Sequence, residues 1–328
     1  MTRFVHRSLL GLAASLVLLS LTTLPRGAAA QTLGVGTMPQ GSLSYATGSA
    51  VAKVLSDSLS LSARVQPNSG ETVLLPLINS GELDFGVANV MEGAEGYNGT
   101  ASFAGRPLKN LRTLAVLFPL RTALFVKKDS GIKTIADLKG KRITWGYSAM
   151  ATVPAIMAAF LANGGLTEAD IKPVLVPNVV RGADDFAAGK ADAFFFGLQA
   201  AKVTEVDVTV GGVMAIPLSN GAAEVAAMKK VFPEGYLDHV APRPGLTGIS
   251  GPTNVLTYDN VLYVGAHVKD EVVQKVVAGL AANKPALAAI NPQFNSFDKA
   301  AMVKSGPVPY HPAVLAWAKQ AGLNPPAK

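Results

Sequence analysis

The sequence has no cysteine among its 328 residues. Disulfides, thiolate metal sites and cysteine nucleophiles all require that side chain, so none of them can form and stability must come from packing. Charged residues make up only 16% of the chain and hydrophobic residues 49%. This composition excludes global disorder, and the length is sufficient for two ordinary domains.

Histidine is also scarce. Beyond residue 30 the chain has only His239, His267 and His311, far apart and never at the spacing of metal ligands. The sequence lacks the G-x-S-x-G elbow of serine hydrolases, the G-x-G-x-x-G dinucleotide fingerprint and a phosphate loop with its lysine. We therefore expect no catalytic residue, no metal, no cofactor and no enzymatic activity. An exported hydrolase or isomerase is the alternative from another class.

The first 30 residues differ in character from the rest. Arg3 and Arg7 precede an apolar run over 9–21, and three alanines end the segment at Ala30. This pattern predicts a secretory signal peptide cleaved after Ala30. An uncleaved anchor is the alternative, but the apolar run is short for a span of about 20 residues.

Removing that segment takes away three arginines and no acidic residue, which lowers the formal net charge from +7 to +4. The remaining lysines are scattered, as on a solvated surface. We therefore expect no nucleic-acid partner.

One order of strands and helices occurs twice in the sequence. Apolar runs that alternate with helices predict parallel sheets covered on both faces. The first unit is expected as a strand at 32–36, a helix at 45–58, a strand at 62–67, a helix at 71–80 and a strand at 83–89. The second is expected as a strand at 141–146, a helix at 154–163, a strand at 172–177, a helix at 181–188 and a strand at 191–197.

The spacing within the two units also agrees. Gly36 lies 48 residues before Asp84, and Gly146 lies 46 residues before Asp192. Each aspartate stands three residues after a glycine that ends a helix, and an apolar strand follows it. Two similar α/β units are therefore predicted, and both aspartates are expected to be structural. The alternative is one long sheet in which the repeated order of elements arises by chance.

Two long strand-like runs, 111–128 and 253–268, can carry the chain into the second unit and back. The helical segments 269–287 and 311–323 would then cover the first unit. A chain that crosses twice forms a hinge and leaves a cleft between two lobes. The predicted boundaries are residues 1–30 for the signal peptide, 31–120 with 256–328 for lobe I, and 121–255 for lobe II.

In open parallel sheets, ligands bind beyond the carboxyl ends of the strands. Turns from strand to helix present free N–H groups there, and these favour anions. The loop TMPQGSLSYATG at 37–48 is polar and uncharged and suits a small carboxylate. Arg121 and Arg181 are the nearest candidates for a cationic partner, and an ordinary surface position is the alternative for either of them. Further loops expected at the same edge are 68–72, Asn89, 147–152, 178–181 and 195–199.

Each of these features has a simpler alternative. Ser69 and Thr152 are also suited to cap helices, which is the commonest task of such residues. Tyr45 is equally suited to pack in a core. Phe194, Phe195 and Phe196 alternate along a strand, so at least one of them must face a core. Only the convergence of several loops favours a ligand site.

The residues resemble the TAXI-type solute-binding proteins of tripartite ATP-independent periplasmic (TRAP) transporters over nearly the whole mature chain. The matching segments are "GTMPQGSLSYATGSAVAKVLS", "NSGETVLLPLINSGELDFGVAN", "GIKTIADLKGKRITWGYSAMAT" and "VKSGPVPYHPAVLAWAKQAGL". The resemblance implies a type II periplasmic-binding-protein fold, with two α/β lobes joined by a two-strand hinge. It also implies a monomeric periplasmic receptor that delivers a small organic anion to the membrane subunits of a TRAP permease. The ligand residues it implies are Gln40, Gly41, Ser42, Ser44, Tyr45, Ser69, Gly70, Glu71, Thr72, Asn89, Ser148, Met150, Thr152, Phe195, Phe196 and Gly197.

The sequence also departs from that family. A tyrosine pair becomes Ser44-Tyr45, and a Gly-Ser-Gly-Thr turn becomes Ala149 to Thr152 with Met150 inside it. These changes remove an aromatic face and a hydroxyl, so a less polar carboxylate than glutamate is expected. A binding protein of an ATP-driven (ABC) transporter or of a sensor kinase is the alternative, because such proteins share the fold.

Overall fold

The computed structural model describes residues 32–324, which belong to one compact unit. The predicted signal peptide lies outside the described residues. Among the residues that are described, no helix combines the length and the apolar character needed to cross a membrane.

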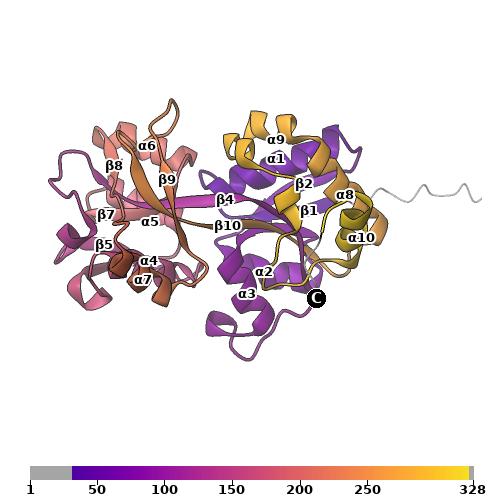
Figure 1. Cartoon of the computed structure of the whole chain (residues 1–328), viewed down its shortest axis with the longest axis horizontal. Coiled ribbons are helices and arrows are strands. Elements are labelled where there is room, and N and C mark those ends of the chain that lie inside the picture. Colours follow the sequence, from indigo (N-terminus) through magenta and orange to yellow (C-terminus); the bar gives the residue numbers. More distant parts are fainter. Residues whose placement is uncertain (1–31, 325–328) are drawn as a thin grey trace, which may run out of the picture. The chain divides into compact units, whose positions relative to one another are not determined.

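Lobe I is built from a parallel ladder at the start of the chain (Figure 1). Strand β1 pairs with β2 on one side and with β3 on the other, each in parallel. Every residue of β1 and β3 is buried, which explains their continuous apolar runs. The elements are β1 (Leu33–Thr37), α1 (Leu43–Asp57), β2 (Ala63–Pro67), α2 (Glu71–Ser80), β3 (Phe85–Asn89) and α3 (Val90–Asn98).

Lobe II repeats this order. Strand β5 pairs in parallel with β6 and β7. Segments between 198 and 252, for which no secondary structure was predicted, add two helices and two short strands. The elements are β5 (Arg142–Gly146), α4 (Val153–Asn163), β6 (Lys172–Val176), α5 (Val179–Ala187), β7 (Ala193–Gly197), α6 (Ala201–Val210), β8 (Val213–Ala215), α7 (Ala222–Val231) and β9 (Tyr236–Val240).

The two predicted aspartates hold equivalent positions in the lobes. Asp84 accepts a hydrogen bond from the amide N–H of Gly34 at 2.7 Å, and Asp192 accepts one from the N–H of Arg142 at 2.9 Å. In both lobes the aspartate before the third strand thus fixes the beginning of the first strand. The prediction that both residues are structural is confirmed.

Strands β4 (Leu111–Lys127) and β10 (Thr253–Gly265) link the lobes and pair with each other in antiparallel fashion (Figure 1). Because β10 also pairs with β3 and β4 with β7, the strands follow the single order β2-β1-β3-β10-β4-β7-β5-β6. The ladder between β4 and β10 shifts register twice, after Asn260 and after Leu262. The expected parallel pairing therefore holds among β1, β2 and β3 and among β5, β6 and β7, whereas β4 and β10 pair with all their neighbours in antiparallel fashion.

The C-terminal segments pack on lobe I. The predicted helix 269–287 is divided at Asn283 into α8 (Asp270–Ala282) and α9 (Lys284–Ile290), with Pro285 in the first turn of α9. Both helices contact α1, and the side-chain amide of Asn291 donates to the hydroxyl of Thr47 at 3.0 Å. The remaining elements are α10 (Pro312–Gln320) and the short 3-10 helices η1 (Ala101–Phe103), η2 (Ile135–Leu138), η3 (Glu168–Asp170), η4 (Pro292–Ser296) and η5 (Ala300–Val303).

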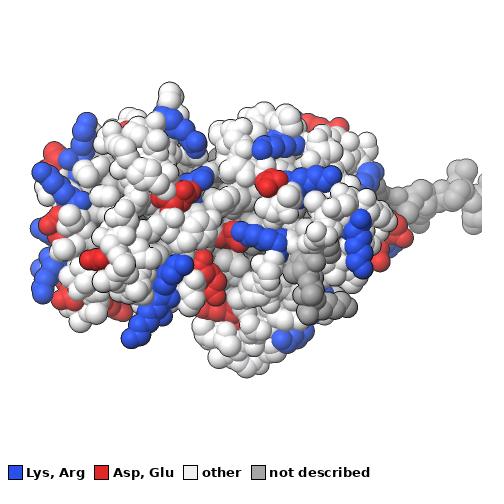
Figure 2. Space-filling view, in the orientation of Figure 1, with Lys and Arg blue, Asp and Glu red and all other residues white. Residues whose placement is uncertain are grey.

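The core of lobe II contains the predicted phenylalanine strand. The ring of Phe194 stacks on that of Phe125, with 5.3 Å between centroids, and lies 4.6 Å from that of Phe186. Figure 2 shows that basic side chains on the visible face are spread over both lobes rather than gathered in one patch.

Candidate ligand-binding site

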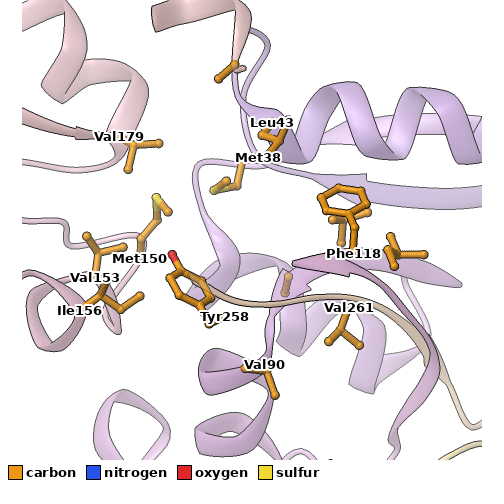
Figure 3. Close-up of a cluster of buried hydrophobic side chains, with 14 of the residues drawn as sticks. Met38, Leu43, Val90, Phe118, Met150, Val153, Ile156, Val179, Tyr258 and Val261 are labelled. Atoms are coloured by element: carbon orange, nitrogen blue, oxygen red, sulfur yellow. The ribbon is translucent and has the colours of Figure 1, made fainter. Parts of the chain in front are cut away.

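A cavity of about 40 Å³ lies where the two lobes meet the linking strands. Figure 3 shows Met150, Val153 and Val179 on one side, facing Met38, Leu43 and Tyr258. The lining residues are Met38, Ser42, Leu43, Ser44, Glu71 and Asn89 from lobe I, Met150, Val153, Val179, Phe195, Phe196 and Gly197 from lobe II, and Leu120, Thr122, Tyr258 and Asn260 from β4 and β10.

Five helices begin at this cavity. Its wall includes Ser42 and Asn89, which cap α1 and α3, and the first residues of α2, α4 and α5. A helix N-terminus carries a positive partial charge of about half a unit, and its first N–H groups lack intrahelical acceptors. The cavity therefore lies in a positive field that attracts negatively charged groups.

The serines of the opening loop already have partners. The Ser42 hydroxyl accepts from the N–H of Tyr45 at 3.1 Å and so caps α1. The Ser44 hydroxyl accepts from the N–H of Met38 and donates to the carbonyl of Val87, both at 3.2 Å. These bonds hold the N-terminus of α1 against β3, so a ligand would meet mainly backbone N–H groups there.

Two buried carboxylates, Glu71 and Glu92, stand at the starts of α2 and α3. Glu71 is 3% exposed and accepts from both the backbone N–H and the side-chain amide of Asn89. Glu92 is fully buried and accepts from the hydroxyls of Thr72 and Thr152. Burial raises the pKa of both, and the negative charge of Glu92 raises the pKa of Glu71 further. Only Glu71 of this pair lines the cavity.

No lysine, arginine or histidine of the described chain lines the cavity. The side chain of Arg121 forms an ion pair of 2.6 Å with Asp238, and that of Arg181 forms one of 3.1 Å with Asp185. Residues alternate along β4, so Leu120 and Thr122 face the cavity while Arg121 points to the other side of the strand. The expectation that Arg121 or Arg181 neutralises the ligand is therefore wrong.

Eight of the predicted ligand residues line the cavity, and eight do not. Those that line it are Ser42, Ser44, Glu71, Asn89, Met150, Phe195, Phe196 and Gly197. Those outside its wall are Gln40, Gly41, Tyr45, Ser69, Gly70, Thr72, Ser148 and Thr152.

Several residues of the second group join the lobes directly. The hydroxyl of Thr72 accepts from the N–H of Ala151 at 2.9 Å, and the carbonyl of Ser69 accepts from the side-chain amide of Asn178 at 3.1 Å. A Cβ added at Gly70 would lie 1.9 Å from the carbonyl oxygen of Ala149, so only glycine permits this approach. These loops hold the lobes together instead of enclosing the cavity.

The capping alternative is wrong for Ser69, and for Thr152 it holds in position but not in hydrogen bonding. The N-cap of α2 is Gly70 rather than Ser69. Thr152 occupies the N-cap position of α4, but its side chain makes no cap hydrogen bond and donates to Glu92 instead. Thr152 thus connects lobe II to a buried acid of lobe I.

Sequence reasoning missed the lining residues of the linking strands. Leu120 and Thr122 of β4 and Tyr258 and Asn260 of β10 stand two positions apart, as residues on one face of a strand do. Asn260 is 3% exposed and faces the cavity. The long runs 111–128 and 253–268 were the available signal, but they do not show which face is turned inward. The other missed residues are Met38, Leu43, Val153 and Val179.

Comparison with known proteins assigns the family. The model of the NMT1-like family matches residues 35–322. This chain belongs to the NMT1-like family. Its fold is similar to that of the alkanesulfonate-binding protein SsuA of Xanthomonas axonopodis pv. citri bound to MOPS. The two sequences are 17% identical, the TM-score is 0.51, and the match covers 89% of this chain and 91% of that one.

Two further structures share the fold. PhnD1 of Prochlorococcus marinus (MIT 9301), in complex with methylphosphonate, has 12% identity and a TM-score of 0.55, and the match covers 89% of this chain and 98% of that one. The periplasmic sulfonate-binding protein SsuA of a putative sulfonate ABC transporter from Methylobacillus flagellatus KT has 16% identity, a TM-score of 0.50 and coverage of 91% and 98%. The predicted α/β periplasmic-binding-protein fold is confirmed.

The assignment to the TAXI proteins of TRAP transporters is wrong. The matching family is NMT1-like, and the similar structures include sulfonate- and phosphonate-binding proteins, one of them from a putative ABC transporter. The motifs behind the assignment perform structural tasks: Gly81 is the left-handed C-cap of α2, and Thr134 and Asp137 form a capping box at η2. Such capping motifs are typical of the fold that these proteins share, and they do not indicate a type of transporter.

The described residues contain no group of three or more histidine, cysteine, aspartate or glutamate side chains that could hold a metal ion.

Proposed function

We propose that this protein is an exported solute-binding receptor of an ABC-type transporter, which holds a small solute between its lobes and releases it unchanged. The observation that carries the proposal is the cavity whose wall comes from both lobes and both linking strands. A solute seated there touches every part that moves if the lobes separate. Export by the segment 1–30 and docking to a membrane permease belong to this proposal.

Closure of the two lobes around the solute is the proposed mechanism of binding. A solute that contacts both lobes binds the closed form more tightly than the open form, and it shifts the equilibrium by that difference in affinity. The hydrogen bonds from Ala151 to Thr72 and from Asn178 to Ser69 support the closed form of the lobes. We propose that the two lobes rotate relative to each other at the predicted boundaries, residues 120–121 and 255–256.

The lining supports binding rather than catalysis. Both cavity serines are engaged in local hydrogen bonds, and no histidine of the described chain stands beside them to act as a base. The predicted absence of catalytic residues is therefore retained as part of the proposal.

The two sides of the cavity differ in polarity and thereby define a solute class. Lobe I and β10 supply Glu71, Asn89 and Asn260, whereas lobe II supplies Met150, Val153 and other apolar side chains. The helix N-termini favour an anionic end. A water-sized site needs roughly 10–15 Å³, so a cavity of about 40 Å³ holds only a few non-hydrogen atoms. We infer a small oxyanion with a short apolar part, such as a short-chain carboxylate or sulfonate.

The fold neighbours support an oxyanion. MOPS and methylphosphonate, the molecules bound in two of them, both carry acidic oxygens. Because these two proteins are only 17% and 12% identical to this chain, their likeness extends to the fold alone. The proposed solute class is therefore argued from the residues that line the cavity of this chain.

A thermal-shift screen tests the function. Acetate, propionate, methanesulfonate and methylphosphonate are added to the mature protein, and a binding solute should stabilise it by about 2.7 kcal/mol at a hundredfold excess over Kd. Gly70→Val should reduce that shift strongly, because its side chain collides with the carbonyl of Ala149 and keeps the lobes apart.

Gly251→Val is the matched control, since a Cβ at Gly251 meets no atom within 4 Å. It should respond to the solute as the parent protein does. The proposal fails if no small oxyanion shifts the melting temperature and none co-purifies in native mass spectrometry, or if Gly70→Val binds as tightly as the parent.

A further inference from the structure

We propose that Glu71 determines the specificity of the cavity: it takes up one proton as a small monoanionic oxyanion binds, and its acid O–H donates to an oxygen of that solute. The inference rests on the proposed function and deepens it. It assigns the ligand class as a monoanion that enters together with a proton.

The balance of charge within the cavity carries the proposal. Glu71 forms part of the wall, Glu92 lies behind it, and no basic side chain of the described residues reaches the cavity. An anion that joined two ionised carboxylates would place three negative charges in a closed, mostly apolar space. Carboxylates that share such a site do not all ionise together, so one of them must carry a proton.

The positive field of the five helix N-termini explains when the proton is bound. In the empty cavity the starts of α2 and α3 favour ionised acids. An entering oxyanion can accept from the N–H groups of Leu43 and Ser44 at the start of α1, and it then places a negative charge in the cavity that Glu71 also lines. That added charge disfavours the ionised form of Glu71, which becomes the easiest group to protonate.

The partners of the two acids decide which one faces the solute. Glu71 accepts from two N–H groups of Asn89, and amide nitrogens can only donate, so a proton on Glu71 has no acceptor there. Glu92 instead meets the hydroxyls of Thr72 and Thr152, which can also accept. A proton on Glu92 can thus be satisfied within the protein, whereas a proton on Glu71 requires an acceptor in the cavity.

The titratable groups around Glu71 are few. Glu92 faces it from α3, and Tyr258 and Tyr263 face it from β10. Burial raises the pKa of both tyrosines, so they remain neutral near pH 7. Among the described residues, α4, α5 and β7 contribute no titratable side chain to the wall. Burial, followed by the charge of Glu92, raises the pKa of Glu71 against the opposing effect of the helix ends, which lowers the cost of adding a proton there.

The step is balanced. The solute anion and one proton from solvent enter together, an O–H bond forms on a carboxylate oxygen of Glu71, and no bond of the solute breaks. Release returns both species. The O–H donor replaces the arginine or lysine that an oxyanion site would otherwise need.

Calorimetry measures the proton directly. Propionate and methanesulfonate are titrated into the mature protein in two buffers of different ionisation enthalpy, at several values between pH 6 and pH 9. At pH values where Glu71 is ionised in the empty protein, we expect uptake of about one proton per bound solute and a Kd that weakens about tenfold per pH unit. Tighter binding of propionate identifies a carboxylate, and tighter binding of methanesulfonate identifies a sulfonate.

Two variants sharpen the experiment. Glu71→Gln keeps a donor amide in place of the protonated acid, so it should still bind the anion, without proton uptake and without the pH dependence. Glu82→Gln changes an exposed acid just beyond the same helix and should leave both properties intact. If Glu71→Gln does not fold, the proton count of the parent protein still decides the question.

The possible outcomes separate this inference from the proposed function. Binding of either anion with no proton uptake at any pH up to 9 overturns the role of Glu71 and leaves the receptor intact. Loss of anion binding in Glu71→Gln together with tight binding of methylammonium to the parent overturns it as well, because Glu71 would then accept from a cation. Failure of every probe to bind overturns both.

Discussion

At the scale of single residues, the hydroxyl of Thr152 has an unexpected partner. It donates to Glu92 across the lobes instead of capping its own helix. Thr152→Val preserves the shape and removes the donor, and a buried carboxylate that loses a partner costs about 1–3 kcal/mol. We expect solute affinity to fall about tenfold or more. The melting temperature without solute should fall by less, because empty protein whose lobes have separated lacks this bond in parent and variant alike.

Calorimetry with propionate on the parent and the variant measures this loss. Thr209→Val is the control, because the hydroxyl of Thr209 is exposed and bonds only within its own helix. Unchanged affinity in Thr152→Val would mean that the bond to Glu92 does not depend on closure.

Sequence patterns identified polar residues at the starts of helices better than residues on strands. Ser42 and Asn89 follow buried strands, and a polar residue there both caps a helix and faces the ligand edge of the sheet. Tyr258 and Asn260 were missed because an alternating strand shows two faces without showing which one borders a cavity. The partners of Arg121 were equally hidden, since Asp238 lies 117 positions away in the sequence.

At the scale of elements, α1 packs against β1 at Gly48. A Cβ added there would lie 2.2 Å from the methyl carbon of Thr37. Alanine normally stabilises a helix interior by up to about 1 kcal/mol over glycine, whereas overpacking costs about 1–3 kcal/mol. Overpacking should prevail, so Gly48→Ala is expected to lower the free energy of unfolding by about 1–2 kcal/mol.

Urea denaturation of the mature protein measures this change. Gly96→Ala in α3 is the matched control, because its new Cβ would meet only flexible leucine side chains, Leu108 at 3.0 Å and Leu75 at 3.6 Å. The control should be neutral or slightly stabilising. A gain in stability in Gly48→Ala would show that α1 is free to move away from β1.

The elements of both α/β units could be predicted because their apolar runs are separated by glycines and caps. The division between α8 and α9 was missed because the apolar pattern continues through Asn283, and only Pro285 marks the break. Segments 198–252 could not be predicted, since β8 has only three residues and α7 has a single buried residue. Short elements of this kind form through tertiary contacts more than through their own sequence.

At the scale of the whole molecule, Glu95 links stability to pH. Burial, followed by the charges of Glu92 and Glu234, raises the pKa of Glu95 to about 7. The native state therefore retains this proton as pH rises from about 4.5 to 7, while the unfolded state loses it. The contribution of protonated Glu95 to the free energy of unfolding is fully present below about pH 4.5 and is lost as the pH rises through about 7.

Thermal unfolding between pH 4 and pH 9 tests this linkage. Glu95→Gln should flatten the decline of stability with rising pH and raise the melting temperature above pH 7. Glu168→Gln, at an exposed site, should reproduce the curve of the parent. A parallel curve for Glu95→Gln would place the titration on another group.

The irregularity in the β4–β10 ladder has a mechanical consequence. A regular antiparallel ladder resists local twisting through its evenly repeated cross-strand hydrogen bonds, and a register shift is a point of lower resistance. The first of the two shifts follows directly after Asn260, which lines the cavity. A rotation of the lobes would therefore pivot beside the bound solute. The segment of β10 around Asn260 would then affect both how tightly the solute is held and how easily the lobes rotate.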